Sequence, residues 1–163
     1  MTGRPEFGEY AADRSTRLLR TAYLLCRDWA TAEDLVQTAL TRAWLAWHRI
    51  GDDPDPYVYR ILANSHVSWW RRRWHGEVPT ERLPDLPGPQ STEVEDRDLL
   101  WDALGRLGRR ERAAVVLRYY ADLEHVAIAE ILGCSPVTVR SQISRALAKL
   151  RADPAVAPIR ERT

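Results

Sequence analysis

The chain of 163 residues has few of the residues that build disulfide-rich or metal-stabilised small domains. Its two cysteines, Cys26 and Cys134, are far apart and predict no disulfide framework. The cysteines and four histidines lack zinc-site spacing, and the isolated glycines form no phosphate-binding loop. No apolar run could span a membrane, and the N-terminus lacks a secretory signal. We therefore expect a cytoplasmic protein with no membrane insertion, metal, cofactor or catalytic residues.

Lysine is nearly absent. Lys149 is the only lysine in the sequence, against 23 arginines, and this bias is typical of a GC-rich genome. The net charge of +1 conceals a strongly uneven distribution. Residues 77–102 carry eight carboxylates and two arginines, whereas residues 138–151 carry four cations and no acid. Residues 71–73 form a second basic block. Local basic patches bind phosphates even when the total charge is near zero, and here one basic patch lies on each side of an acidic middle.

Apolar residues recur at three- and four-residue steps and no strand pattern is evident, so the sequence predicts an all-α fold. Four prolines and two glycines lie between His75 and Thr92 and predict an extended, acidic linker. We therefore expect two small helical domains and a frayed tail. The predicted boundaries are residues 6–75 for the first domain, 76–92 for the linker, 93–151 for the second domain and 152–163 for the tail.

Three helices are expected in the first domain. The first covers about Glu6 to Arg27, Trp29 lies in the turn, and Thr31 begins the second helix. The second helix has an apolar stripe that ends at Trp44 and stops before the Gly51–Pro54 turn. Asp55 and Pro56 suit the cap and first position of the third helix. Its predicted inward face consists of Val58, Ile61, Leu62, Ser65 and Trp69.

The segment Leu123 to Arg151 predicts two helices joined by a tight turn. Gly133 ends the first helix, because only glycine adopts a left-handed conformation without steric cost. Ser135 can cap the second helix, and Pro136 suits its first position. Apolar residues at helical spacing point inward and leave a polar row outside. That row contains Arg140, Ser141, Ser144 and Arg145, with Thr138, Gln142 and Lys149 beside it. Such side chains read base edges in the major groove, although a solvated helical hairpin is the alternative.

Three segments together resemble the extracytoplasmic-function (ECF) sigma factors, subunits that direct bacterial RNA polymerase to promoters. The segments are AEDLVQTALTRAW (residues 32–44), DPYVYRILANSHVSWWRRRW (residues 55–74) and VVLRYYADLEHVAIAEILGCSPVTVRSQISRALAKLR (residues 115–151). The tryptophan-rich SWWRRRW and the segment LLRTAYLL are most similar to the actinobacterial SigE-family branch. The resemblance implies that the first domain is sigma region 2 and the second is the helix-turn-helix sigma region 4.

The resemblance also assigns roles to residues. It implies that Asp34, Gln37 and Arg42 bind the clamp helices of core polymerase, while region 4 binds the flap and the −35 element. The residues expected at the −35 element are Thr138, Arg140, Ser141, Gln142, Ser144, Arg145 and Lys149. The residues expected to bind and open the −10 element are Tyr59, Arg60, Asn64, Trp70, Arg71, Arg72 and Arg73. Aromatic rings can stack an unpaired base, and an amide can read its edge.

Two residues depart from the family's pattern. Gln142 stands where many relatives have a cation, and Glu124 replaces the usual Ser or Thr cap. The expected partners are core polymerase and promoter DNA, the free chain is expected to be a monomer, and an anti-sigma factor is left open. A conventional helix-turn-helix repressor or activator is the alternative function, and it explains only the C-terminal half. A protein-interaction adaptor is a third interpretation.

Overall fold

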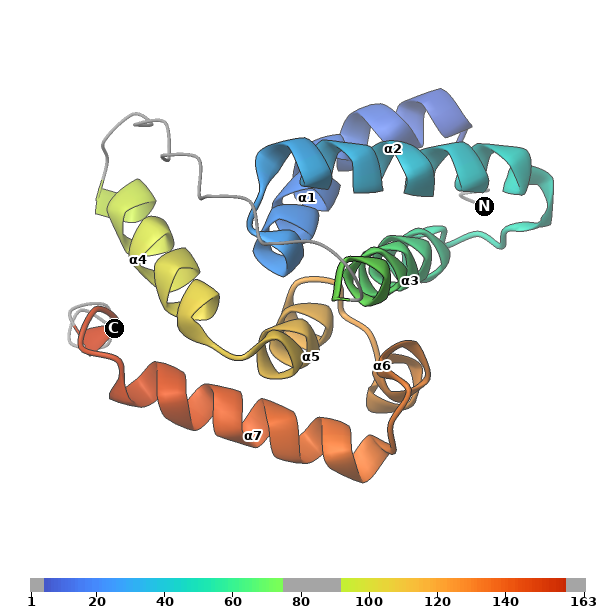
Figure 1. The fold of residues 1–163 in the computed structure, drawn as a ribbon. Helices are drawn as coiled ribbons and strands as arrows, with labels where there is room; N and C mark the ends of the chain where they lie inside the picture. Colours follow the sequence, from blue (N-terminus) through green and yellow to red (C-terminus); the bar gives the residue numbers. More distant parts are fainter. Residues whose placement is uncertain (1–4, 75–91, 158–163) are drawn as a thin grey trace.

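The computed structural model describes residues 5–74 and 92–157 of the chain, without the side chains of residues 71–74 and 92–95. These residues form seven α-helices and one short 3-10 helix, and the described ranges contain no strand, as the sequence predicts. The helices are α1 (Phe7–Cys26), α2 (Trp29–Leu45), α3 (Asp55–Trp74), α4 (Thr92–Arg106), α5 (Arg109–Tyr119), α6 (His125–Leu132) and α7 (Pro136–Ala152), with η1 (Trp47–Arg49) after α2. Figure 1 shows α1 and α2 side by side above α3, and α7 beneath α5 and α6.

The turn between α1 and α2 differs from the sequence prediction. Arg27 ends α1 with a left-handed φ of 61°, and its N–H donates to the carbonyl of Tyr23. The carboxylate of Asp28 then accepts a hydrogen bond from the N–H of Thr31 at 3.0 Å, so Asp28 is the cap of α2. The prediction that Thr31 begins the helix was therefore wrong by two residues. Trp29 is the first helical residue and does not lie in the turn.

Helix α3 is buried on more than one face. Val58 and Leu62 lie in the core as predicted, but Tyr59, Ala63 and Val67 are buried as well. The reason is that α3 packs against α1 and α2 and also against α6. Periodicity in a single sequence identifies only one inward stripe, so it missed the residues of α3 that its other neighbouring helices cover. The prediction for Trp44 of α2 was wrong in the opposite sense. Trp44 was expected to be the last residue of the buried apolar stripe, but it is exposed.

The two halves of the chain share one hydrophobic core. Buried residues of α1, α2 and α3 belong to the same contiguous cluster as buried residues of α4, α5, α6 and α7. Helix α1 contacts α4 and α5, and α3 contacts α6. The two helical modules expected from the sequence are therefore packed directly against each other, in an arrangement that the sequence did not indicate.

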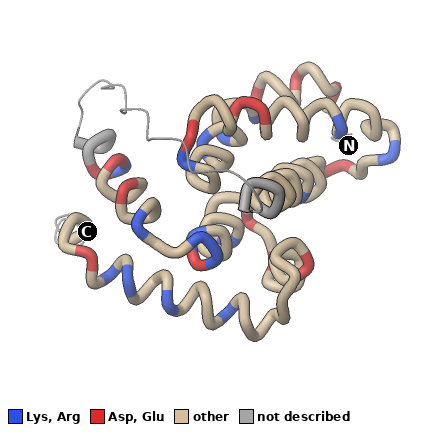
Figure 2. The backbone as a smooth tube through the Cα atoms, in the orientation of Figure 1, with Lys and Arg blue, Asp and Glu red and all other residues tan. Residues whose placement is uncertain are grey.

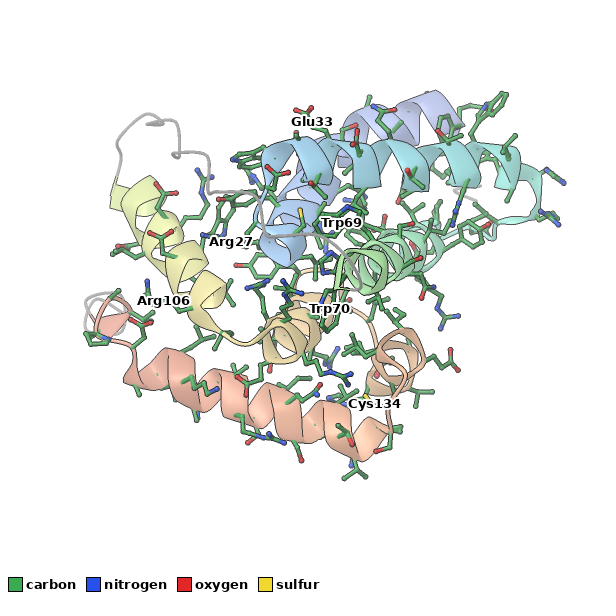
Figure 3. The ribbon with its side chains drawn as sticks, in the orientation of Figure 1. Arg27, Glu33, Trp69, Trp70, Arg106 and Cys134 are labelled. Carbon is green, nitrogen blue, oxygen red and sulfur yellow. The ribbon has the colours of Figure 1, made fainter. Side chains whose placement is uncertain are left out.

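Arg27, labelled in Figure 3, makes polar contacts between the halves. Its Nη1 donates to the carbonyl of Trp101 in α4 at 2.9 Å, and its Nη2 lies 3.4 Å from the carboxylate of Asp102. The guanidinium also lies 5.1 Å from the centre of the Tyr23 ring. A Cβ at Gly105 would lie 2.8 Å from Nε of Arg27, so the glycine lets the guanidinium approach the α4 backbone closely.

Aromatic and ionic contacts extend this interface. Tyr23 stacks on Trp29 with ring centres 4.0 Å apart, and Trp101 lies 5.7 Å from Tyr23. Arg60 of α3 pairs with Glu130 of α6 at 3.3 Å. Because Arg60 and Glu130 are both largely exposed, this ion pair stabilises the interface only weakly.

The segment after α7 is packed rather than frayed as far as it is described. Asp153 accepts two hydrogen bonds from Arg106 of α4, at 2.9 and 2.8 Å, and Val156 is buried. The prediction of a tail that is frayed directly after Arg151 was therefore wrong for residues 153–157. Residues 158–163 lie outside the described part of the chain.

A buried histidine lies at the same junction. Burial, together with the nearby guanidinium groups of Arg112 and Arg109 in α5, lowers the pKa of His66 in α3 to about 4. The neutral ring is therefore the form that fits the folded chain. Since this pKa is below the ordinary 6.5, the stability tied to the neutral ring is present above pH 6.5 and is lost as the pH falls toward 4.

We expect the wild-type chain to lose roughly 2 kcal/mol of unfolding free energy through His66 between about pH 7.5 and pH 5. A His66→Phe variant should lose less over that interval, and urea unfolding followed by circular dichroism measures the difference. The control is His48→Phe, since His48 is exposed. Parallel pH profiles for wild type and His66→Phe would show that His66 does not titrate with folding.

Candidate nucleic-acid interface

The hairpin formed by α6 and α7 has the local geometry predicted for a helix-turn-helix. Gly133 ends α6 with a left-handed φ of 71°. The hydroxyl of Ser135 accepts the N–H of Thr138 at 3.2 Å, and Pro136 occupies the first turn of α7. Glu124 makes no side-chain cap at the start of α6, as expected from its departure from the family's pattern. These features fix how the outer face of α7 is presented.

The outer face of α7 is polar and basic. Arg140, Ser141, Ser144 and Arg145 are all exposed, as the helical spacing predicted, while Val139, Ile143 and Ala146 are buried against the hairpin. Figure 2 shows basic residues spaced along α7, with acid only beyond its C-terminal end. An exposed face of this kind can meet both phosphates and base edges.

Three other residues expected on this face are engaged within the protein. Gln142 is only 7% exposed, so the prediction that it lies beside the outer row was wrong; it falls on the side of α7 that packs inward. The hydroxyl of Thr138 shares a hydrogen bond with that of Ser135 at 2.9 Å. Lys149 pairs with Glu111 of α5 at 2.8 Å, which directs its ammonium toward the protein.

A shallow groove of about 230 Å³ runs along the α6 side of this face. Its walls contain Arg140 and Ser144 from the predicted set, together with His125 and Arg151. Sequence reasoning missed the last two. His125 opens α6, far along the chain from Arg140, and only the hairpin geometry brings the two helices to one groove.

The predicted polymerase-binding residues lie on the outer side of α2. Asp34, Gln37 and Arg42 are all exposed, as expected. Asp34 and Arg42 line a groove of about 460 Å³ between α2 and α3, and Asn64 of α3 lines the same groove. Trp69, expected in the core, is half-buried at this groove and also lies 6.3 Å from the His66 ring (Figure 3). Residues predicted to bind polymerase and a residue predicted to open the −10 element therefore line the same groove.

The predicted −10 residues of α3 differ in how far they are exposed. Asn64 is exposed, Arg60 pairs with Glu130, and Trp70 is half-buried with Arg109 lying 5.5 Å from its ring centre. Tyr59 is only 1% exposed, so the prediction that it can stack an unpaired base was wrong for this arrangement. Residues 71–73 continue α3, but their side chains lie outside the described part.

Tyr59 is buried because α1 covers it. The guanidinium of Arg17 lies 5.6 Å from the centre of the Tyr59 ring, and Nη2 of Arg17 donates to the carbonyl of Tyr120 at 3.3 Å. Burial raises the pKa of Tyr59. The ring therefore supports the core of the N-terminal half rather than a DNA-facing surface.

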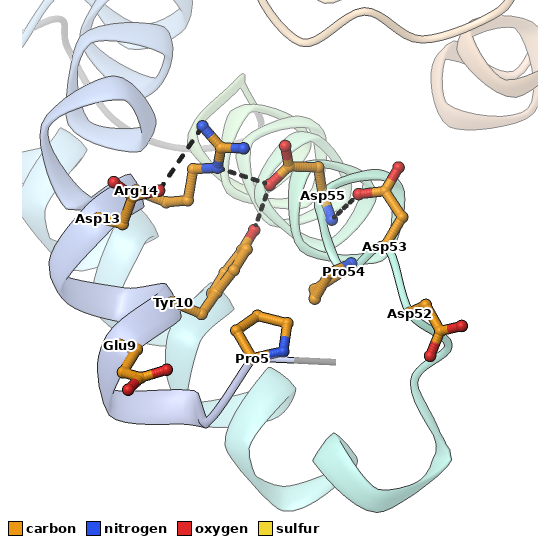
Figure 4. A pocket seen from close by; sticks show the side chains of 9 residues that line it. All are labelled: Pro5, Glu9, Tyr10, Asp13, Arg14, Asp52, Asp53, Pro54 and Asp55. Carbon is orange, nitrogen blue, oxygen red and sulfur yellow. Dashed lines mark hydrogen bonds and ion pairs between the residues drawn. The ribbon is translucent and has the colours of Figure 1, made fainter. Parts of the chain in front are cut away.

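The turn before α3 is anchored to α1 (Figure 4). The hydroxyl of Tyr10 donates to Asp55 at 2.7 Å, and Nε of Arg14 lies 3.3 Å from the same carboxylate. Burial, together with this hydrogen bond, raises the pKa of Tyr10. The pocket here, about 370 Å³, is lined by five carboxylates: Glu9, Asp13, Asp52, Asp53 and Asp55. Its charge would repel phosphates, so we assign it the structural task of holding the start of α3.

Neither cysteine has the setting of a nucleophile. Burial raises the pKa of Cys26 to about 11, which keeps it a thiol at neutral pH, and Cys134 is half-buried in the hairpin turn. Within residues 5–74 and 92–157, no cluster of three or more His, Cys, Asp or Glu side chains could hold a metal ion. In the same residues, no helix is both long enough and apolar enough to cross a bilayer.

Comparison with known proteins decides the family. Residues 12–76 match the family Sigma-70 region 2, and residues 97–150 match Sigma-70, region 4. The chain belongs to the sigma-70 family. It is 44% identical over 149 residues to the RNA polymerase sigma-E factor of Streptomyces coelicolor, covering 90% of this chain and 84% of that protein. It is 32% identical over 142 residues to the ECF RNA polymerase sigma factor SigL of Mycobacterium tuberculosis, covering 82% and 80%.

Solved structures agree with this assignment. The sigma factor RpoE of Bartonella quintana, crystallised with the anti-sigma factor NepR, superposes with a TM-score of 0.69 at 27% identity over 90% of this chain and 94% of that one. CnrH, solved with the cytosolic domain of CnrY, has a TM-score of 0.57 at 24% identity over 90% of this chain and 85% of that one, which shows a shared fold. The chain is thus an ECF sigma factor of the SigE branch, and it functions in transcription initiation. The repressor interpretation is not favoured, because it leaves the region 2 match unexplained.

We expect Tyr59→Phe to leave promoter opening unchanged, because the ring is covered by Arg17 and cannot reach a base. Tyr59→Ala should instead lower the unfolding free energy by about 3–5 kcal/mol, as removal of a buried aromatic ring does. Urea unfolding and a fluorescent base analogue in the −10 segment measure the two effects. An opening defect in a stably folded Tyr59→Phe protein would restore Tyr59 to the DNA-binding set.

Proposed function

We propose that this sigma factor binds core polymerase through α2, opens the −10 element at the groove between α2 and α3, and reads the −35 element with α7. In this proposal residues 6–75 and 93–151 are the two working domains. The chain itself catalyses no reaction and acts in the cytoplasm. The observation that carries the −35 assignment is the exposed row of Arg140, Ser141, Ser144 and Arg145 on a helix whose other face is buried.

The chemistry of α7 suits base recognition. Arginine can donate two hydrogen bonds to guanine, and serine hydroxyls can donate or accept. The groove that Arg140 and Ser144 share with His125 and Arg151 adds cationic and imidazole groups along one side of the helix. Lys149 and Gln142 contribute less in this proposal, because one pairs with Glu111 and the other is buried.

The chemistry of the α2–α3 groove suits strand opening next to polymerase. Asn64 can read a base edge through its amide, while Asp34 and Arg42 on the same groove offer charged groups to a protein partner. Polymerase bound at α2 would lie beside the base that Asn64 holds. Arg60 and Trp70 become available in this proposal only when their contacts with Glu130 and Arg109 are released.

A protein inhibitor is part of the proposal. RpoE of Bartonella quintana was solved with an anti-sigma factor, and this chain superposes on RpoE across both halves. That likeness supports an anti-sigma factor as a third partner, beside core polymerase and promoter DNA. The free chain is proposed to be a monomer.

The direct test is run-off transcription with purified core polymerase on genomic fragments, with start sites mapped by sequencing. We expect transcripts that require this chain and share paired −35 and −10 motifs. Tight binding to DNA by the chain alone, with no transcript when core polymerase is added, would instead indicate a conventional regulator.

We expect Arg140→Ala to weaken binding of the polymerase complex to its −35 element by about 1–3 kcal/mol, because a bidentate base contact is lost. Binding is measured by fluorescence anisotropy on specific and scrambled −35 duplexes. Arg20→Ala removes the same charge from an exposed position on α1 and serves as the control. An equal loss on scrambled DNA would show that Arg140 contacts only phosphate.

We expect Asn64→Ala to slow opening of the −10 element while closed-complex affinity stays unchanged, since Asn64 meets the base only after unpairing. A fluorescent base analogue reports opening, and anisotropy reports the closed complex. Thr16→Ala, at an exposed position of α1 outside this groove, is the control. Equal losses in both steps would refute a role for Asn64 that is specific to opening.

A further inference from the structure

Val137 is an apolar residue at a position where the outer face of α7 is otherwise polar. It is 68% exposed, the highest value among the large exposed hydrophobic side chains of the described residues. It is the second residue of α7, three and four positions before Arg140 and Ser141. Residues at this spacing lie on one face of a helix, so Val137 extends the −35-reading row toward the helix N-terminus.

The polar neighbours of Val137 are occupied by the cap. The hydroxyl of Thr138 shares a hydrogen bond with Ser135, and the N–H of Thr138 donates to the same serine oxygen. Pro136, on the other side, has no N–H to donate. The first turn of α7 therefore presents the two methyl groups of Val137, and not a hydroxyl, to whatever meets it.

The N-terminal residues of a recognition helix are the ones that contact base edges in the major groove. The C5-methyl group of thymine is the one apolar group that the four bases display there. A valine side chain offers no hydrogen bond to guanine, adenine or cytosine, but it can exclude water from a methyl group. Burial of Val137 against such a methyl group removes apolar surface of both groups from water, which favours binding.

We propose that Val137 packs against the C5-methyl group of a thymine in the −35 element, next to the base pair that Arg140 contacts. The proposal rests on the proposed function of α7. Burial of one methyl group between Val137 and the base should strengthen binding roughly fourfold relative to the same site with uracil.

The test uses the full-length chain bound to core polymerase. Two duplex pools carry a randomised −35 segment beside a fixed −10 element, one synthesised with thymine and the other with uracil. Sequencing of the bound fraction should reveal one position where thymine is enriched and uracil is not. Anisotropy on a single selected duplex, with thymine or uracil at that position, then measures the expected fourfold difference.

Variants separate Val137 from the rest of the helix. Val137→Ala should bind thymine and uracil duplexes equally, whereas Val137→Thr, which keeps one methyl group, should still favour thymine. Alanine is a strong helix former, so Val137→Ala should fold normally, which circular dichroism verifies. The matched control is Val126→Ala, because Val126 is 60% exposed but lies on α6; it should discriminate like the wild type.

Two results would overturn the proposal while leaving the function of α7 intact. One is a selected −35 element that the wild type binds equally with thymine and with uracil at every position. The other is a Val137→Ala variant that still discriminates as the wild type does. If neither pool yields any enriched −35 sequence, the proposed function fails, and the role of Val137 fails with it.

Discussion

One hydrophobic core runs through both halves of this sigma factor, and the guanidinium of Arg27 adds a polar contact to the backbone of α4. Arg27 adopts a left-handed conformation at the end of α1, which turns its side chain toward Trp101 and Asp102. The absence of a side chain at Gly105 allows the close approach. In the same interface α5 lies against α1, and α6 lies against α3.

The predictions from the sequence that succeed concern structure within single helices and turns. Local chemistry is well specified: Gly133 has its left-handed φ, Ser135 caps α7, and the alternation of buried and exposed residues in α7 follows from helical spacing. The resemblance to ECF sigma factors is carried by three such segments, so the family could be predicted as well. These features depend on residues close together in the chain.

The failures depend on residues far apart in the chain. Tyr59 was expected outside but is covered by Arg17, whose own position is fixed by Tyr120 in the other half. Lys149 was expected to face DNA but pairs with Glu111 of α5. Arg151 lies on the same face of α7 as Arg140 and could have been found from helical spacing, but His125 was missed because only the folded hairpin brings it beside Arg140. Helical periodicity contains no information about such pairings, since it describes one helix at a time.

The direct packing of α3 on α6 limits how far the molecule can reach. Neighbouring packed helices lie about 8–10 Å apart, so α3 and α7 are separated by roughly 20 Å through α6. The −35 and −10 elements lie about 25 base pairs apart, or roughly 85 Å along B-form DNA. One molecule in this arrangement cannot touch both. Contact with both elements therefore requires α1 to separate from α4 and α3 from α6, which breaks the interactions of Arg27 and Arg60 described above.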